Sequence, residues 1–223
     1  MKDALPRIAP YALYLGIVFL GVVLAALASS YPGSAFDPRW LYPLQIGAAA
    51  AALAYFWRRY EELRGKAPSM RVVVVSVAIG LVVFLAWISA DWAWATLGEP
   101  TGSDPRRPDG TIDWTLVAPR LVGAVIVVAV IEELFWRSLV MRWLDRNDFL
   151  RQDPRHVGWR AFVITALVYG FAHTFWFAGV LAGLAYGWLY ARTANLWAPV
   201  IAHAVANAAV GAWMLYRGAW QYW

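Results

Sequence analysis

Seven runs of apolar residues constrain this chain more than any other feature. A helix needs about 20 apolar residues to cross the hydrocarbon core of a bilayer. The runs approach that length: Ile8–Ala28, Leu41–Trp57, Val72–Ala90, Leu121–Met141, Ala161–Phe177, Ala178–Ala191 and Trp197–Tyr216. We predict an all-α fold, a polytopic transmembrane helical bundle of about seven spans (six to eight), in which the fifth and sixth runs form two spans or one bent hairpin.

The composition supports an integral membrane protein. Hydrophobic residues make up 61% of the chain and charged residues 15%, whereas soluble domains have about 45–50% and 25%. The absence of cysteine excludes disulfides, thiol catalysis and cysteine-ligated metals. No internal repeat or linker is evident, so we predict one integral membrane domain over residues 1–223.

The basic residues indicate an orientation in the membrane. If each run crosses once, most of them fall on one side: Lys2, Arg7, Arg58, Arg59, Arg64, Lys66, Arg71, Arg142, Arg146, Arg151, Arg155, Arg160 and Arg192. Because Lys and Arg concentrate in cytoplasmic loops, we predict a cytoplasmic N-terminus and an external C-terminus. This asymmetry also explains the net charge of +5 without a nucleic-acid partner.

Two local patterns refine the picture of the helices. Ala26-Leu27-Ala28 resembles a signal-peptide cleavage site, but its apolar run is longer than the usual 7–15 residues, so we expect an uncleaved helix. Gly179, Gly183 and Gly187 recur every four residues. They share one helix face and predict close packing against a neighbouring helix.

Charged residues inside the fourth run are the first sign of function. Each costs roughly 2.5–3.5 kcal/mol at a helix centre on insertion scales, yet the run contains Glu132, Glu133 and Arg137. Glu133 and Arg137 are four residues apart and can form an ion pair on one face. Glu132 is rotated by about 100° from Glu133 and needs a different partner.

Two later runs supply polar partners at a similar depth. His173 lies in the fifth run, and His203 lies in the seventh with Asn207 four residues on. At 1.5 Å per residue, Glu132, His173 and His203 lie about 9–20 Å from the basic flanks of their runs. The sequence therefore predicts one common site inside the membrane.

The polar segments resemble the motifs of the CAAX protease and bacteriocin-processing family of intramembrane proteases, which includes the type II CAAX prenyl endopeptidases. Residues 132–137, Glu-Glu-Leu-Phe-Trp-Arg, match the EExxxR motif. Residues 169–173 match FxxxH, with Tyr169 in place of the usual Phe, and residues 203–207 match HxxxN. The resemblance covers about residues 120–215, which we expect to form the catalytic core.

The resemblance implies a membrane-embedded endopeptidase that cleaves a membrane-associated protein or peptide near its C-terminus. Carried over to this sequence, Glu132 and His173 would activate the water, and His203 and Asn207 would stabilise the oxyanion. Glu133 and Arg137 would hold the site together, and the Tyr169 hydroxyl could add a hydrogen bond beside it. We expect the location to be a bacterial inner membrane, because Ala-, Arg- and Trp-rich residue usage is typical of a high-GC bacterium.

Metal dependence and two other functions stay open at this stage. We expect no cofactor, because the spacing differs from the H-E-x-x-H pattern of zinc proteases; if Zn²⁺ binds, its ligands would be Glu132, His173 and His203. A proton-coupled transporter could use the same three residues as a relay. A non-catalytic membrane scaffold or immunity-type protein could share the fold. The substrate and the oligomeric state are not readable from the sequence.

Overall fold

The computed structural model describes residues 2–29, 38–90, 92–100, 102 and 104–222. In this part of the chain, each predicted run corresponds to a helix or to a helical rod. The main elements are α1 (Leu5–Ser29), α2 (Leu41–Phe56), α4 (Met70–Ser89), α5 (Trp114–Val122), α6 (Ala129–Glu133), α7 (Arg142–Asp145), α8 (Trp159–Phe171), α9 (Trp176–Thr193) and α10 (Trp197–Arg217). The prediction of an all-α membrane bundle is confirmed.

Short elements complete the chain. Two π-helical stretches, η4 (Gly123–Val128) and η5 (Leu134–Met141), join α5, α6 and α7 into one continuous rod. The remaining elements are the short helix α3 and six 3₁₀ turns: α3 (Glu61–Arg64), η1 (Pro38–Trp40), η2 (Trp57–Arg59), η3 (Ala93–Ala95), η6 (Phe149–Arg151), η7 (Pro154–His156) and η8 (Trp220–Tyr222).

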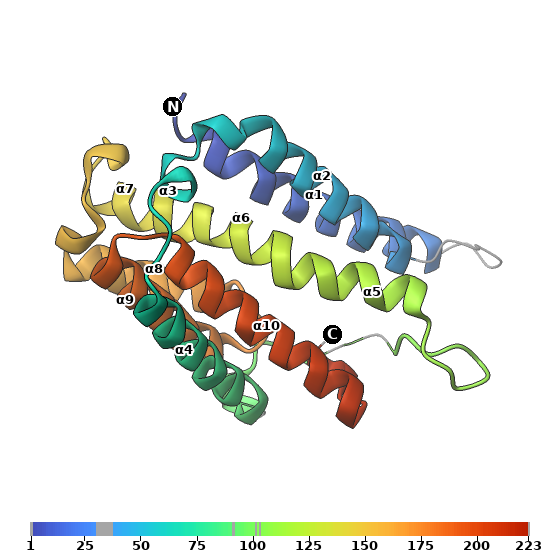
Figure 1. Ribbon diagram of the computed structural model, residues 1–223. Coiled ribbons are helices and arrows are strands. Elements are labelled where there is room, and N and C mark those ends of the chain that lie inside the picture. The colour runs from blue at the N-terminus through green and yellow to red at the C-terminus, as the bar shows by residue number, and fades with distance from the viewer. Residues whose placement is uncertain (1, 30–37, 91, 101, 103, 223) are drawn as a thin grey trace.

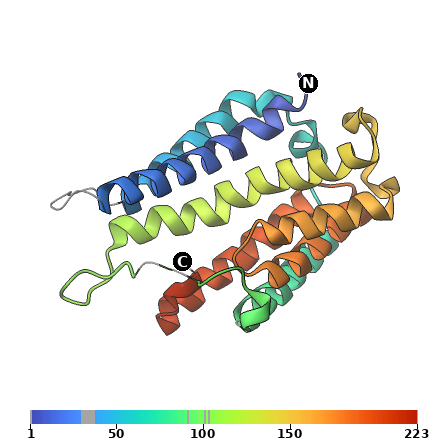
Figure 2. The same ribbon diagram turned by 180° about the vertical axis from the view of Figure 1, so that it is seen from behind.

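The rod from residue 114 to residue 145 is the central element. Figures 1 and 2 show α1 and α2 side by side along one flank of it, and α4, α8, α9 and α10 along the other. Helix α4 packs along α10, and α8 packs along α9. The rod therefore contacts both groups of helices and can present side chains to a space between them.

Within the part of the chain that the structure describes, four segments are long and apolar enough to cross a bilayer: Leu5–Leu27, Met70–Ser89, Trp114–Asp145 and Trp197–Arg217. Their outer faces fit a lipid environment, since Phe19 is 70% exposed and Val82 is 64% exposed. Helix α8 has 13 residues and is about 20 Å long, shorter than the hydrocarbon core. The predicted count of seven spans is therefore approximate.

The fifth and sixth runs form a helical hairpin, and one predicted boundary is wrong. We expected the fifth run to continue to Phe177 with His173 inside it, but α8 ends at Phe171 and His173 lies in the turn before α9. The His173 ring explains part of this, because its Nδ1 bonds to the Tyr169 carbonyl (2.7 Å), which a longer helix would use.

The glycine prediction is confirmed at the contact between α8 and α9. A Cβ atom on Gly179 would lie 2.9 Å from the Gly170 Cα, and one on Gly183 would lie 2.9 Å from the Ala166 Cα. Real Cβ atoms do not approach backbone so closely, so these positions need glycine. The two helices pack backbone against backbone, which fixes the height of the turn that contains His173.

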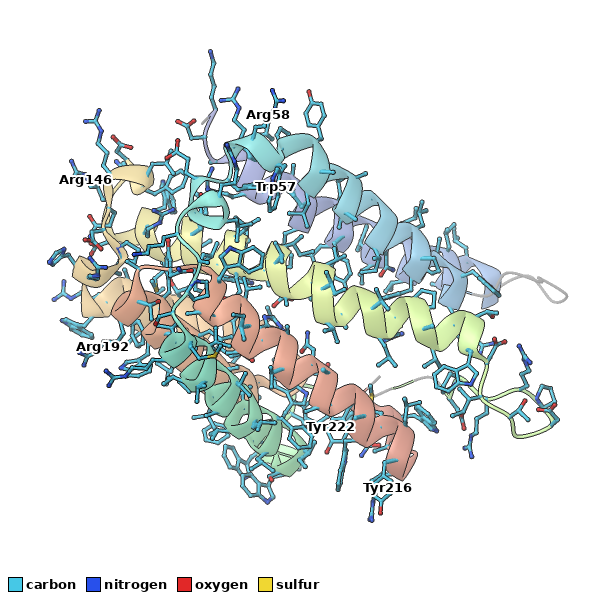
Figure 3. The ribbon with its side chains drawn as sticks, in the orientation of Figure 1. Trp57, Arg58, Arg146, Arg192, Tyr216 and Tyr222 are labelled. Carbon is cyan, nitrogen blue, oxygen red and sulfur yellow. The ribbon has the colours of Figure 1, made fainter. Side chains whose placement is uncertain are left out.

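The basic residues gather at one end of the bundle. Figure 3 shows Arg58, Arg146 and Arg192 at the end where the chain begins, and Tyr216 at the other. We call the first of these the basic end. The arrangement is the one that the charge pattern predicted.

Two residues of that set are not loop charges, contrary to expectation. Arg7 and Arg142 are buried, 2% and 6% exposed. Arg7 Nη2 lies 2.6 Å from Glu62 Oε2, and Arg142 Nη2 lies 3.3 Å from Glu62 Oε1. The Ser138 hydroxyl donates a hydrogen bond to Glu62 as well. These four residues form the Glu62 cluster, in which the two buried arginines share the carboxylate of the half-buried Glu62.

Candidate active site

Glu133 occupies the centre of a buried polar network. Its Oε1 accepts hydrogen bonds from Arg137 Nη1 (3.1 Å) and from His203 Nδ1 (2.9 Å). Glu133 and Arg137 are almost fully buried, 0% and 1% exposed. The ion pair that the spacing predicted is therefore present. The sequence did not reveal the bond from Glu133 to His203, which ties α6 to α10.

Glu132 lies on another face of α6, toward His173. The distance from Glu132 Oε2 to His173 Nε2 is 3.9 Å, too long for a direct hydrogen bond. This buried oxygen has no hydrogen-bond partner among the described residues. A gap of this size suits one water molecule bonded to both side chains. Glu133 Oε2 is likewise buried without a partner, but of the two glutamates it is Glu132 that lines the cavity.

The orientation of His173 follows from its own turn. A backbone carbonyl can only accept, so the 2.7 Å contact with Tyr169 makes Nδ1 the donor. The neutral ring then presents Nε2 as an acceptor toward Glu132. Trp87 of α4 packs edge-on against the same ring, with centroids 5.5 Å apart. Backbone and aromatic contacts together fix this imidazole.

Aromatic rings also hold the Arg137 guanidinium. It lies over Tyr169, 4.2 Å from the ring centroid, and over Tyr186, 5.3 Å from the centroid. Tyr186 in turn stacks on His203 with centroids 5.2 Å apart. Such cation–π contacts stabilise a cation away from water. Tyr169 therefore supports the site through its ring and its carbonyl, and Tyr186 is a support that sequence reasoning missed.

Asn207 lies one turn beyond His203 on α10. Its Nδ2 donates to the Ala124 carbonyl (2.8 Å) in the π-helical stretch η4. An amide nitrogen has two hydrogens, so one donor of Asn207 remains. The side chain lines the same cavity as Glu132 and His173.

A cavity of about 250 Å³ brings these groups together. Glu132, Tyr169, His173, His203 and Asn207 line it, whereas Glu133 and Arg137 lie behind its wall. Parts of the chain outside residues 120–215 also contribute to the lining, which the motifs did not indicate: Tyr14, Tyr42, Val83, Trp87 and Tyr222. These residues carry no motif, so only the packing of α1, α2 and α4 reveals them.

The three residues named above as alternative Zn²⁺ ligands can be compared with the arrangement in the structure. Within the described ranges, no three His, Asp or Glu side chains gather closely enough to hold a metal ion. His203 and His173 each use Nδ1, for Glu133 and for the Tyr169 carbonyl, and Nε2 of each ring is the nitrogen left for another ligand. Independence from a metal therefore stays a prediction.

Comparison with known proteins places this site in a family. Residues 114–209 match the family described as type II CAAX prenyl endopeptidase Rce1-like. These residues form an Rce1-like domain. The match begins at the first residue of α5 and ends two residues after Asn207, so the Rce1-like domain contains all seven predicted site residues. No curated protein and no solved structure matches the chain.

The Rce1-like family is a family of CAAX proteases, so the domain supports a peptidase in general. Together with the apolar helices, it identifies an integral membrane protein. Tyr169, at the Phe position of the FxxxH motif, contacts Arg137 through its ring and His173 through its carbonyl, two contacts that a Phe can also make.

Proposed function

We propose that this chain is an intramembrane endopeptidase that hydrolyses a peptide bond of a membrane-associated protein near its C-terminus. One observation carries the proposal: the buried Glu132 carboxylate faces His173 across 3.9 Å, in a cavity whose wall also carries His203 and Asn207. A base and fixed hydrogen-bond donors around one small space are what amide hydrolysis needs.

Glu132 and His173 bind and activate the water. A water between them donates one hydrogen to the Glu132 carboxylate and one to His173 Nε2. Glu132 takes a proton as the water oxygen attacks the carbonyl carbon, which gives a tetrahedral oxyanion. The C–N bond then breaks, and Glu132 returns the proton to the leaving amine nitrogen. General acid–base catalysis of this kind contributes about 10²–10⁴-fold to the rate.

His203 and Asn207 stabilise the oxyanion by donating hydrogen bonds to it. Asn207 has one amide hydrogen left beyond its bond to Ala124. His203 donates from Nδ1 to Glu133, so its Nε2 can donate to an oxyanion only from the doubly protonated ring. Loss of one oxyanion donor lowers kcat by about 10²–10³-fold in enzymes of this kind.

We further propose that the protein lies in a bacterial inner membrane with its basic end in the cytoplasm. The clustering of Arg58, Arg146 and Arg192 at one end supports this orientation. The proposed mechanism requires no metal, and its partners are the bilayer and a membrane-anchored protein or peptide substrate.

The test compares protein termini, by mass spectrometry, in membranes from cells that make the wild type, Glu132→Gln or Glu61→Gln. Glu61 is an exposed glutamate of α3 and serves as the matched control. We expect a new C-terminus with the wild type and with Glu61→Gln, and none with Glu132→Gln. Addition of 1,10-phenanthroline to wild-type membranes should leave the cleavage unchanged.

Two results would contradict the proposal. Identical termini in all three membranes, with the proteins equally abundant and inserted, would favour the scaffold or the transporter. Cleavage that phenanthroline abolishes and added Zn²⁺ restores would overturn the metal-free mechanism while leaving the peptidase in place.

A further inference from the structure

The cavity extends from the site in one direction. On the central rod its lining runs from Glu132 back to Arg120, and on α10 it runs from His203 forward to Met214. Residue 114, where the rod begins, and residue 217, where α10 ends, both lie at the end of the bundle opposite the basic end. The cavity therefore extends from the site toward that opposite end.

Packed side chains close the other direction. Leu134, Arg137 and Tyr186 lie on the side of the site nearer the basic end, and each is at most 1% exposed. The Glu62 cluster forms a second buried layer beyond them. A peptide that reaches Glu132 along the axis of the bundle therefore comes from the end opposite the basic end.

Arg120 is an unusual residue in this wall. Among the described residues that line the cavity, it alone has a permanent positive charge. Its guanidinium lies over the Tyr42 ring, 5.1 Å from the centroid. Arg120 is half-buried and lies six residues after the rod begins at Trp114. Guanidinium binds carboxylates in a bidentate geometry, which makes an acidic group of the substrate the fitting ligand.

The spacing agrees with an extended peptide. Arg120 precedes Glu132 by twelve residues on the same rod, which is about 18 Å along a helix axis. Both side chains tilt toward the helix N-terminus, so their polar groups keep roughly this separation. An extended peptide covers about 3.3–3.6 Å per residue. About five residues would connect a carboxylate at Arg120 with a scissile bond at Glu132.

We propose that Arg120 binds a carboxylate of the substrate peptide, about five residues from the scissile bond, as the peptide enters from the end opposite the basic end. This inference rests on the proposed endopeptidase function and adds a specificity residue to it. The carboxylate is either the C-terminal α-carboxylate or an Asp or Glu side chain near the C-terminus, and both use the same recognition chemistry.

The test measures peptide binding without turnover. The full chain with Glu132→Gln is purified in nanodiscs and mixed with fluorescent palmitoylated decapeptides, whose last six positions are randomised. One set of peptides ends in a free carboxylate and the other in a C-terminal amide. Each set is made as two pools, one with Asp and Glu among the randomised residues and one without them. We expect fluorescence anisotropy to show at least about tenfold tighter binding of the pool that carries the recognised carboxylate.

Variants link this preference to Arg120. Adding Arg120→Gln to Glu132→Gln should abolish the preference, and Arg120→Lys should keep part of it, because a lysine retains the charge without the bidentate geometry. Arg217→Gln removes an exposed arginine at the same end of the bundle and should change nothing. A preference for the acid over the amide identifies the α-carboxylate, and a preference for Asp and Glu identifies the side chain.

Equal or absent binding of all pools to Glu132→Gln, or a preference that survives Arg120→Gln, would overturn the role of Arg120. The same pools are also incubated with the wild type and analysed by mass spectrometry. If peptides bind through Arg120 but are never cleaved, the endopeptidase function is contradicted while carboxylate binding by Arg120 is supported. The two failures are therefore distinguishable.

Discussion

Glu132 and Glu133 are neighbours in the sequence but occupy different electrostatic surroundings. Glu133 forms an ion pair with Arg137 and a hydrogen bond with His203, so its carboxylate stabilises the fold of the site. Each glutamate has one buried oxygen without a hydrogen-bond partner, and that of Glu132 faces His173. The rotation of about 100° between adjacent helix positions separates the two roles. One carboxylate is thus available for proton transfer while the other maintains the geometry.

This division predicts opposite effects on stability. Glu133→Gln leaves the Arg137 guanidinium buried without its counterion, and breaking a buried pair costs about 3–5 kcal/mol. Its melting temperature in detergent should fall clearly, measured by tryptophan fluorescence. Glu132→Gln should melt like the wild type, because Glu132 has no ion pair at bonding distance. A strongly destabilised Glu132→Gln beside an unaffected Glu133→Gln would contradict these assignments.

Among the elements, the helical hairpin and the Glu62 cluster position the site. The α8–α9 contact sets the height of the turn with His173. The Glu62 cluster joins α1 through Arg7, α3 through Glu62 and the end of the rod through Ser138 and Arg142. It anchors the rod on the side of the site nearer the basic end. We therefore expect Glu62 to be a structural residue.

The pH dependence of stability tests this role. Burial raises the Glu62 pKa, but the hydrogen bonds and charge of Arg7, with the Ser138 hydrogen bond, outweigh it and leave the pKa below its ordinary value of 4.5. A lowered folded-state pKa stabilises the fold above about pH 4.5 and loses that contribution as the pH falls through the lowered value.

The melting temperature of the wild type should therefore fall as the pH is lowered from about 6 to about 3. Glu62→Gln should melt lower than the wild type at about pH 6 and show a flatter profile, whereas Glu61→Gln should follow the wild type. Parallel profiles for the wild type and Glu62→Gln would show that the cluster contributes no pH-dependent stability.

At the scale of the whole molecule, the basic residues and the open side of the cavity lie toward opposite ends of the bundle. Arginines gather at the basic end, and the cavity leads away from it. With the basic end in the cytoplasm, as proposed, the cavity is reached from the external side. The substrate segment would then be one that is presented on that side of the membrane.

The lack of cysteine makes this accessibility measurable. Single cysteines at Val210 in the cavity, Val82 on the lipid-facing surface and Arg58 at the basic end can be introduced without background. A membrane-impermeant maleimide added to intact cells should label Val210→Cys alone, and cell lysis should add Arg58→Cys. Labelling of Arg58→Cys in intact cells, with Val210→Cys protected, would reverse the proposed orientation.

Much of the bundle and of the site was predictable, because its determinants are local. Glu133 and Arg137 pair within one turn, and the glycines of α9 share one face, so spacing alone indicated both. The end of α8 was not predictable, since the residues after Phe171 are also apolar or aromatic. There the hydrogen bond from the His173 ring to Tyr169, rather than hydropathy, accompanies the end of the helix.

By itself, the sequence determined the helical membrane class, the gathering of basic residues at one end and the three polar motifs. Hydropathy and periodicity act over one helix turn or one span, so one chain suffices to read them. Only the tertiary structure decided that Glu133 bonds His203, that Glu132 faces His173 and that Arg120 shares their cavity. These contacts join segments far apart in the chain or depend on cavity shape, and side-chain packing alone sets them.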